Sequence, residues 1–285
     1  MSPPLSATHR SIQRIVRGRP TSDGAGVRLS RVIGSPDLDH LDPFLLLDEF
    51  GSERGADYIA GFPDHPHRGF ETVTYMLAGR MEHRDHMGNH GELDAGSVQW
   101  MTAGRGIIHS EMPRQSDGLM RGFQLWVNLP AKDKMCEPRY QDIPPDAIPE
   151  VRLDGGGLVR IIAGEHGGER GAVSAIVTDP TYLDVHLPAG KGHEFQLPGD
   201  HQGLVYAYEG KGHFGEPATA VEKGQLGVLG AGESLRVTAD NDELRFLLIA
   251  ARPLREPIVR YGPFVMNSRE QILEAVRDYQ SGRFG

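Results

Sequence analysis

His65-Pro66-His67 and His109-Ser110-Glu111 stand near the two ends of the stretch from Gly61 to Pro113, and this stretch decides the predicted fold. In each motif one residue separates the two chemically active side chains. Successive side chains of a β-strand point to opposite faces, so each pair shares one face of its strand. Two such strands side by side would direct three imidazoles and one carboxylate toward a common centre. Imidazole and carboxylate together suit a first-row divalent metal such as iron, copper, nickel, manganese or zinc.

Composition limits the protein class. The 285 residues are enough for one large domain or two ordinary ones. A formal charge of −9, with no dense run of Lys or Arg, argues against direct nucleic-acid binding. Cys136 is the only cysteine, which excludes an intrachain disulfide and fits a reducing compartment. The first ten residues lack an apolar signal core, and the longest apolar run, Phe246 to Ala251, is too short to cross a bilayer. We therefore expect a cytoplasmic protein with no membrane contact.

Short apolar runs separated by many glycines and prolines predict a β-rich chain. The strands expected in the first half are 28–33, 42–50, 70–78, 81–85, 97–101, 107–112 and 121–128. Those expected in the second half are 158–163, 172–178, 182–187, 204–209, 226–229, 235–238 and 244–250. The one strong helix signal is last: Ser268 and Gln271 fit a capping box, and Gly282 is placed to end the helix.

Domain boundaries follow from the change in composition after Leu129. Residues 131–150 hold several prolines among mixed charges and are expected to connect two domains. The prediction is a disordered tail over 1–10, a metal-binding barrel over 11–130, the connector over 131–150 and a second barrel over 151–285 that ends in the helix.

The two halves resemble each other. Leu77–His83 is similar to Tyr208–Phe214, and the turn at Gly96 is similar to the turn at Gly224. When the two halves are aligned on these similar segments, the four candidate ligands correspond to Gln196, Pro198, Val237 and Ala239. These residues cannot replace the ligands. The repeat predicts two similar β-barrels, of which only the first keeps a metal site.

Longer motifs extend this interpretation. Gly61, His65, His67, Glu71 and Gly79 look like the first cupin motif, and Gly96, Gly104, Gly106 and His109 look like the second. The segments 65–73 and 99–111 closely resemble the pirin family, as do 42–50 and the segment from Gly262 through the last helix. The resemblance implies an all-β bicupin fold, with two antiparallel cupin barrels and a short C-terminal helix. It also implies one divalent metal ion per chain, held by His65, His67, His109 and Glu111.

Iron is the expected ion, although zinc, copper, nickel and manganese suit the same ligands. Glu71 is where the chain departs from the general cupin pattern. Other cupins often use the glutamate of the first motif as a ligand, whereas pirins use the one after the last histidine. We therefore expect Glu71 to lie beside the ligands and to orient one of them or Arg68.

The resemblance leaves two main classes of function. The first is an enzyme of the quercetin 2,3-dioxygenase type, which converts a flavonol and dioxygen into a depside and carbon monoxide. Glu111 would then be both a ligand and the general base for the flavonol hydroxyl proton. The second is a metal-dependent or redox-dependent regulator that binds a transcription factor or a metabolic enzyme. A sugar isomerase is a weaker third alternative, because the extra basic groups for a phosphorylated sugar are missing. We expect a monomer.

Overall fold

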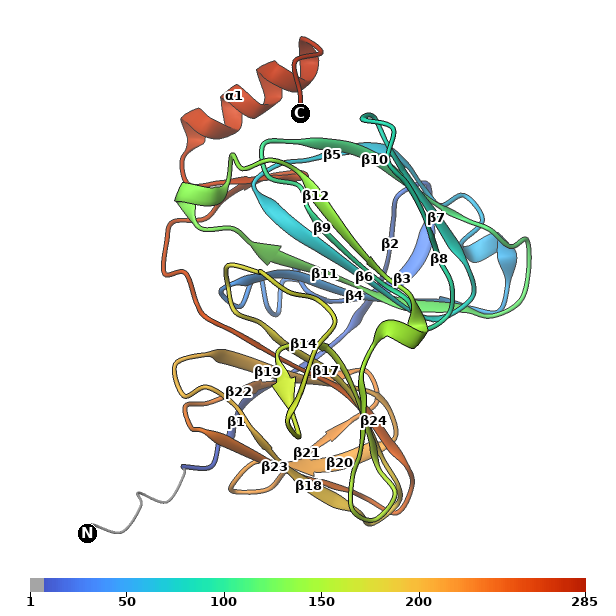
Figure 1. Cartoon of the computed structure of the whole chain (residues 1–285), viewed down its shortest axis with the longest axis vertical. Coiled ribbons are helices and arrows are strands. Elements are labelled where there is room, and N and C mark those ends of the chain that lie inside the picture. The colour runs from blue at the N-terminus through green and yellow to red at the C-terminus, as the bar shows by residue number, and fades with distance from the viewer. Residues whose placement is uncertain (1–7) are drawn as a thin grey trace. The chain divides into compact units, whose positions relative to one another are not determined.

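Two seven-stranded and two four-stranded antiparallel sheets hold most of the chain in the computed structural model (Figure 1), which describes residues 8–285. The contacts among these residues divide the chain into two units. The first unit comprises residues 19–147 and 254–285, and the second comprises residues 8–18 and 148–253. Each unit contains one sheet of each size, as expected for two antiparallel β-barrels.

In the first unit the seven-stranded sheet has the order β12-β9-β6-β11-β4-β3-β2, and the four-stranded sheet has the order β5-β10-β7-β8. Their bounds are β2 Arg19–Asp23, β3 Val27–Ile33, β4 Phe44–Ser52, β5 Phe62–His67, β6 Phe70–Ala78, β7 Met81–Asp85, β8 His90–Leu93, β9 Val98–Thr102, β10 Ile107–Pro113, β11 Met120–Asn128 and β12 Arg139–Ile143. A hairpin of β25 (Val259–Tyr261) and β26 (Phe264–Met266) leads into helix α1 (Arg269–Gln280).

In the second unit the corresponding orders are β1-β22-β19-β24-β17-β14-β13 and β18-β23-β20-β21. Their bounds are β1 Ile12–Arg17, β13 Glu150–Arg152, β14 Leu158–Ala163, β17 Thr181–Leu187, β18 Gly192–Gln196, β19 Gln202–Glu209, β20 Lys211–Phe214, β21 Thr219–Glu222, β22 Gln225–Leu229, β23 Ser234–Ala239 and β24 Leu244–Ala251. A small hairpin, β15 (Glu165–His166) and β16 (Glu169–Arg170), lies between β14 and β17.

The internal repeat is confirmed by this topology. The order β9-β6-β11-β4-β3 in the first unit matches β22-β19-β24-β17-β14 in the second. Gly79 and Gly210 follow equivalent strands with φ of 83° and 73°, a backbone conformation that glycine adopts without a steric penalty. Where β12 borders β9 in the first unit, β1 borders β22 in the second.

The two units are not consecutive along the chain, whereas the sequence predicted consecutive domains. Most of the expected connector belongs to the first unit, because β12 pairs with β9. Residues 254–285, which were expected in the second barrel, belong to the first unit as well. The expected tail over 1–10 lies outside the described residues up to residue 7. Beyond it the prediction is wrong at Arg10, which is 1% exposed and donates hydrogen bonds to the carbonyl groups of His201 and Pro198.

The interiors of the two units differ. In the second unit one continuous cluster of buried apolar side chains, including Phe195, Phe214 and Phe246, fills the space between the sheets. In the first unit the apolar residues form several smaller clusters. Some interior-facing side chains there are polar, as the candidate site shows.

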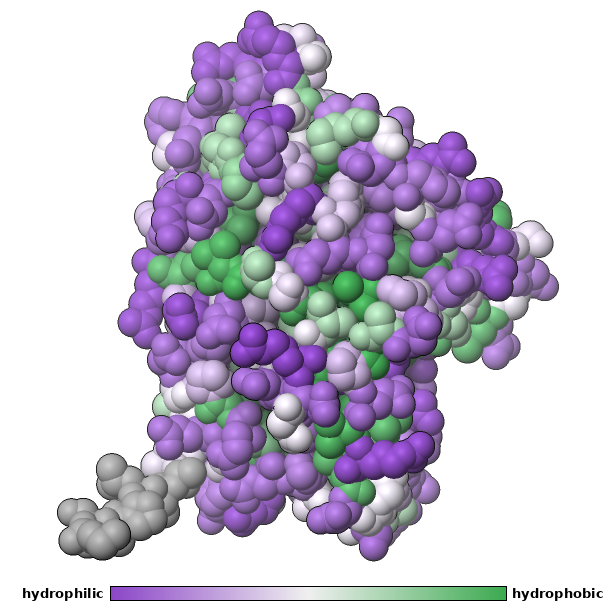
Figure 2. Space-filling view, viewed as in Figure 1, coloured by the Kyte–Doolittle hydropathy of each residue, from purple (hydrophilic) through white to green (hydrophobic). Residues whose placement is uncertain are grey.

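Helix α1 begins as predicted. The Ser268 side chain accepts a hydrogen bond from the Gln271 amide, and the Gln271 side chain accepts one from the Ser268 amide. Side chains at the top of Figure 2, where α1 lies in Figure 1, are mainly hydrophilic. No helix among residues 8–285 is both long and apolar enough to span a bilayer. The strand expected over 172–178 is wrong. Only Val173 makes a bridge there, and the positive φ of Ala175 breaks the extended backbone.

Candidate metal centre

Three histidines meet where β5 and β10 run side by side. The two strands are antiparallel, with His109 directly opposite His65 and Ile107 opposite His67. The imidazole centroids of His65 and His109 are 4.4 Å apart, and those of His67 and His109 are 4.9 Å apart. One ring nitrogen from each histidine lies within 4.8 Å of the other two. The i, i+2 spacing thus places these three side chains around one point.

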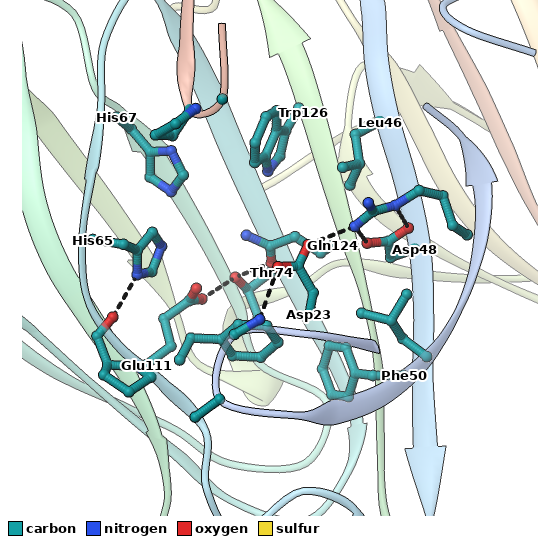
Figure 3. Close-up of a pocket in the computed structure, with 18 of the residues that line it drawn as sticks. Asp23, Leu46, Asp48, Phe50, His65, His67, Thr74, Glu111, Gln124 and Trp126 are labelled. Atoms are coloured by element: carbon teal, nitrogen blue, oxygen red, sulfur yellow. Dashed lines mark hydrogen bonds and ion pairs between the residues drawn. The ribbon is translucent and has the colours of Figure 1, made fainter. Parts of the chain in front are cut away.

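Glu111 lies on the same strand as His109 but stands outside that group of nitrogens. The pairing of β10 with β5 shifts between His109 and Glu111, because β5 has one extra residue there, while β10 stays in regular register with β7. The Glu111 Oε1 atom accepts a hydrogen bond of 2.9 Å from the Thr74 hydroxyl, and the side chain lines the same cavity as His65 and His67. In Figure 3 the Glu111 carboxylate points into the space below the two histidines.

His67 and His109 are held in the neutral form that binds a metal. Burial, and then the neighbouring imidazole of His65, lowers the pKa of His67 well below its ordinary value. Burial, followed by His67, His65 and His83, does the same for the pKa of His109. Neutral imidazole is the ligand form, since a protonated ring has no free lone pair.

An unpartnered nitrogen supports the fit of a metal ion. The His109 Nε2 atom is buried and makes no hydrogen bond to any described residue. A buried polar atom without a partner costs about 1–3 kcal/mol, which a coordinated cation would offset. His65 Nδ1 is 2.8 Å from the Pro63 carbonyl oxygen, so Nδ1 carries the proton and leaves Nε2 free to coordinate. The donor set therefore fits a first-row divalent cation.

His83 supports His109 from behind. The Nδ1 atoms of the two rings are 3.2 Å apart, and the His83 ring packs at a tilt against Tyr140 with centroids 4.6 Å apart. His83 is 1% exposed, because β7 pairs with β10 and places His83 opposite Glu111 in the barrel wall. A ligand histidine is commonly oriented by a partner on its second nitrogen.

The C-terminal segment braces the backbone beside His67. Arg68 donates to the Asp278 carboxylate at 2.8 Å, and its guanidinium lies 4.5 Å from the centre of the Phe284 ring. Lys134 Nζ is fully buried and donates to the Gly69 carbonyl at 2.7 Å and to the Val265 carbonyl at 2.9 Å. Residues from three distant parts of the chain thereby fix the end of β5.

Glu71 lies away from the histidines. Thr74 faces the cavity, and Glu71, three residues earlier on β6, points to the opposite face of the sheet. Its Oε1 accepts a hydrogen bond of 2.7 Å from Thr102, and burial raises its pKa to about 7. The expectation that Glu71 orients a ligand or Arg68 has no contact to support it among the described residues.

A second group of metal-ligating side chains contains Glu82, His90 and Glu92. Glu82 is buried, but it forms ion pairs with both Arg84 and Arg114. Its charge is therefore already balanced, and a metal ion would have to displace two guanidinium groups. His90 and Glu92 are exposed, so this group offers no enclosed site.

A cavity of about 580 Å³ opens beside the histidines. Its walls are mainly apolar and carry a few polar groups, as is typical of a small-molecule site. Figure 3 shows Trp126 and Leu46 along one wall and Phe50 along another. The lining residues include Asp23, Arg31, Leu46, Asp48, Phe50, Thr74, Glu111, Gln124 and Trp126.

Comparison with known proteins shows the family. Residues 26–127 match the pirin family, and residues 182–285 match the pirin C-terminal cupin domain. The chain belongs to the pirin family. A Pseudomonas aeruginosa protein provisionally named quercetin 2,3-dioxygenase is 51% identical over 96% of this chain and 98% of its own length. A pirin-like protein of Caulobacter vibrioides is 49% identical over 96% of this chain and 99% of its own length.

Solved structures agree with the bicupin fold. A crystal structure of quercetin 2,3-dioxygenase from Acinetobacter baumannii superimposes with a TM-score of 0.89. The match covers 97% of this pirin-family chain and 98% of the other, at 33% identity. The fold class predicted from the two cupin motifs is thereby confirmed.

Proposed function

We propose that this pirin-family protein is a metal-dependent dioxygenase that cleaves flavonols such as quercetin. The observation that carries the proposal is the convergence of His65, His67 and His109 at the wall of a cavity that is mainly apolar and large enough for a three-ring aromatic molecule. The names of the Pseudomonas and Acinetobacter relatives support the same substrate class. The proposal takes the protein as a cytoplasmic monomer that uses a flavonol and dioxygen.

The ion would be held by the three imidazoles and by Glu111, one ion per chain. Iron is the proposed ion, and zinc, copper, nickel and manganese suit the same donors. When bound, a divalent cation with open coordination positions stabilises the oxyanion of the flavonol 3-hydroxyl group and so favours its deprotonation.

Glu111 would accept that proton. Its carboxylate lines the cavity on the side of the histidines, and general bases act within hydrogen-bond reach of the proton they remove. Thr74 holds one carboxylate oxygen through its hydroxyl, which leaves the other oxygen to face the cavity. The apolar walls would exclude water from the deprotonated flavonol, whose reaction with dioxygen gives a depside and carbon monoxide.

The test separates metal binding from proton transfer. Glu111→Gln keeps the shape of the side chain but removes its charge and its capacity to accept a proton. We expect the metal to remain on the three imidazoles while flavonol-dependent oxygen uptake falls by roughly 10²–10⁴-fold. Metal content and rate are measured on the same preparation, because lost metal would imitate lost catalysis.

Glu71→Gln is the matched control. Glu71 is a buried glutamate of the same unit, on the other sheet, but it points away from the cavity, so its variant should keep the parent rate. Near-parent turnover in Glu111→Gln with full metal content would remove Glu111 as the base. If the parent protein consumes no more oxygen than free metal does, the dioxygenase proposal fails and the regulator becomes the better explanation.

A further inference from the structure

A continuous row of polar side chains crosses the interior face of the seven-stranded sheet in the first unit. Each member is the cross-strand partner of the next member on the neighbouring strand. Cross-strand partners share one face of a sheet, so the side chains form a single line. In order from β12 to β3 the row is Asp142, Gln99, Thr74, Gln124, Asp48 and Arg31, and we call it the polar belt.

Contacts within the belt and across the barrel show that it faces the interior. Thr74 reaches the Gln124 side chain at 2.7 Å and also Glu111 on the opposite sheet at 2.9 Å. At the far end of the row, Arg31 makes a bidentate pair with Asp48, with distances of 2.9 and 2.7 Å. The belt therefore contacts Glu111 through Thr74 and ends at a partly buried ion pair.

Apolar rows border the belt on both sides. One row holds Trp126 and its cross-strand partner Leu46, and the other holds Phe50 and its partner Leu29. All four side chains line the cavity. The space between the rows is thus a polar strip with apolar edges, which suits a flat molecule with apolar faces and polar substituents.

The second unit shows that the fold does not require such a belt. Its equivalent interior row is apolar, with Val205, Leu248 and Leu183 at the positions of Thr74, Gln124 and Asp48. A buried ion pair contributes little net stability, because the desolvation of both charges offsets their attraction. Stability alone therefore does not explain why the first unit keeps Asp48 and Arg31 in its cavity.

The Arg31 guanidinium has one amino group to spare. Its Nε and Nη2 atoms serve Asp48, and Nη2 also reaches Asp23 at 2.6 Å. The Nη1 group makes no hydrogen bond to another described residue, and Arg31 lines the cavity. Figure 3 shows the two histidines and Glu111 on one side of the cavity and Asp48 on the opposite side. The Arg31–Asp48 pair thus lies at the side of the cavity away from the histidines, and the Asp23 carboxylate lies between this pair and Glu111.

We propose that the Arg31–Asp48 end of the polar belt recognises the hydroxyl groups on the remote ring of a planar polyphenol whose other end is oriented by the histidines. A phenolic oxygen would accept from Arg31 Nη1, and its O–H would donate to Asp23 or Asp48. This inference deepens the proposed function and rests on it. It makes Arg31 and Asp48 specificity residues and narrows the substrate class to flavonols hydroxylated on the pendant ring.

The experiment compares two flavonols that differ only at that ring. Quercetin carries two pendant-ring hydroxyl groups, and galangin carries none. Dissociation constants are measured by tryptophan quenching on the metal-loaded protein under argon, so that binding is recorded without turnover. We expect the parent to prefer quercetin by about tenfold to a hundredfold, the usual range for hydrogen bonds to charged groups.

The double variant Arg31→Leu/Asp48→Leu removes the pair together and leaves no lone buried charge. It should abolish the preference and leave galangin binding within about twofold of the parent. Glu49→Leu/Arg121→Leu is the matched control, because this pair is also partly buried on β4 and β11 but points to the other face of the sheet. If the double variant fails to fold, Arg31→Lys tests the same point, since it keeps a charge but loses the spare amino group.

The outcomes separate the two proposals. If both flavonols bind the parent equally, or if Arg31→Lys and the double variant keep the full preference for quercetin, the belt inference is overturned and the dioxygenase proposal is unaffected. If neither flavonol binds the metal-loaded parent, the flavonol proposal fails and this inference fails with it. Loss of the preference in these variants and not in the control supports the assignment.

Discussion

Lys134 should make the stability of the first unit depend on pH in a way that a single substitution removes. Its Nζ is buried and is surrounded by three oxygen acceptors, the carbonyl groups of Gly69 and Val265 and the side chain of Asn128. Burial lowers its pKa from 10.5 to about 7. Between these two values the unfolded chain binds a proton at Lys134 that the folded chain does not.

The sign and size of the effect follow from linkage. Stability rises with pH wherever the unfolded state binds more protons, by up to about 1.4 kcal/mol for each pH unit. Below pH 7 the charged ammonium is buried in the folded state and its full desolvation cost remains. Raising the pH from about 7 to about 9.5 should therefore stabilise the first unit by about 3 kcal/mol through this one group.

Both tryptophans of the chain, Trp100 and Trp126, lie in the first unit, so their fluorescence reports its unfolding. Urea unfolding is recorded at several pH values for the parent, for Lys134→Met and for the exposed control Lys132→Met. Lys134→Met removes the titrating group, so its free energy of unfolding should rise less with pH, while Lys132→Met should follow the parent. Equal slopes for the parent and Lys134→Met would refute the reasoning and show that the three oxygens keep the ammonium charged.

Three further predictions concern the metal centre. Elemental analysis of the purified protein should give about one metal ion per chain, because one set of ligands is complete and the equivalent positions of the second unit are apolar or amide side chains; a value near two would contradict this. Chelation should lower the melting temperature by mass action and leave the β-sheet circular dichroism intact at room temperature, since the barrel has its own core; loss of that signal on adding chelator would contradict a preformed barrel. Thr74→Val should lower flavonol-dependent oxygen uptake by about tenfold at unchanged metal content, because it removes the hydroxyl that holds Glu111; an unchanged rate would show that Glu111 needs no such support.

Much of the fold could be predicted because its signals are local. The strands Phe70–Ala78 and Met81–Asp85 were predicted to the residue, since a glycine turn separates two runs of strand-forming residues. The capping box at Ser268 fixed the start of α1 in the same way. The His-x-His and His-x-Glu spacings predicted that three histidines would meet on neighbouring strands. This signal is also local, because residues two apart share one face of a strand.

The remaining features depend on pairings between distant segments. Strand β1 pairs with β22, about two hundred residues later, and nothing in Ile12–Arg17 names that partner. His83 becomes a support for His109 only because β7 lies beside β10. The polar belt is likewise invisible in the sequence, since its members are spread from Arg31 to Asp142 and align only once the strand order is known. A repeat of glycines can predict two barrels, but it cannot assign the terminal segments to them.

The N-terminal segment belongs to the second unit and the C-terminal segment to the first, and this arrangement has a consequence for synthesis on the ribosome. The first unit needs residues 254–285, which supply Asp278 and Phe284 to Arg68 and the Val265 carbonyl to Lys134. These residues are made only after all of residues 148–253, which takes about 5–20 s at ordinary rates of translation. During that interval the three histidines have left the ribosome while the brace beside His67 is still missing. Completion of the metal centre is therefore timed to the end of translation, so a chain stalled before residue 254 would carry every proposed ligand and still lack the structure that holds them in place.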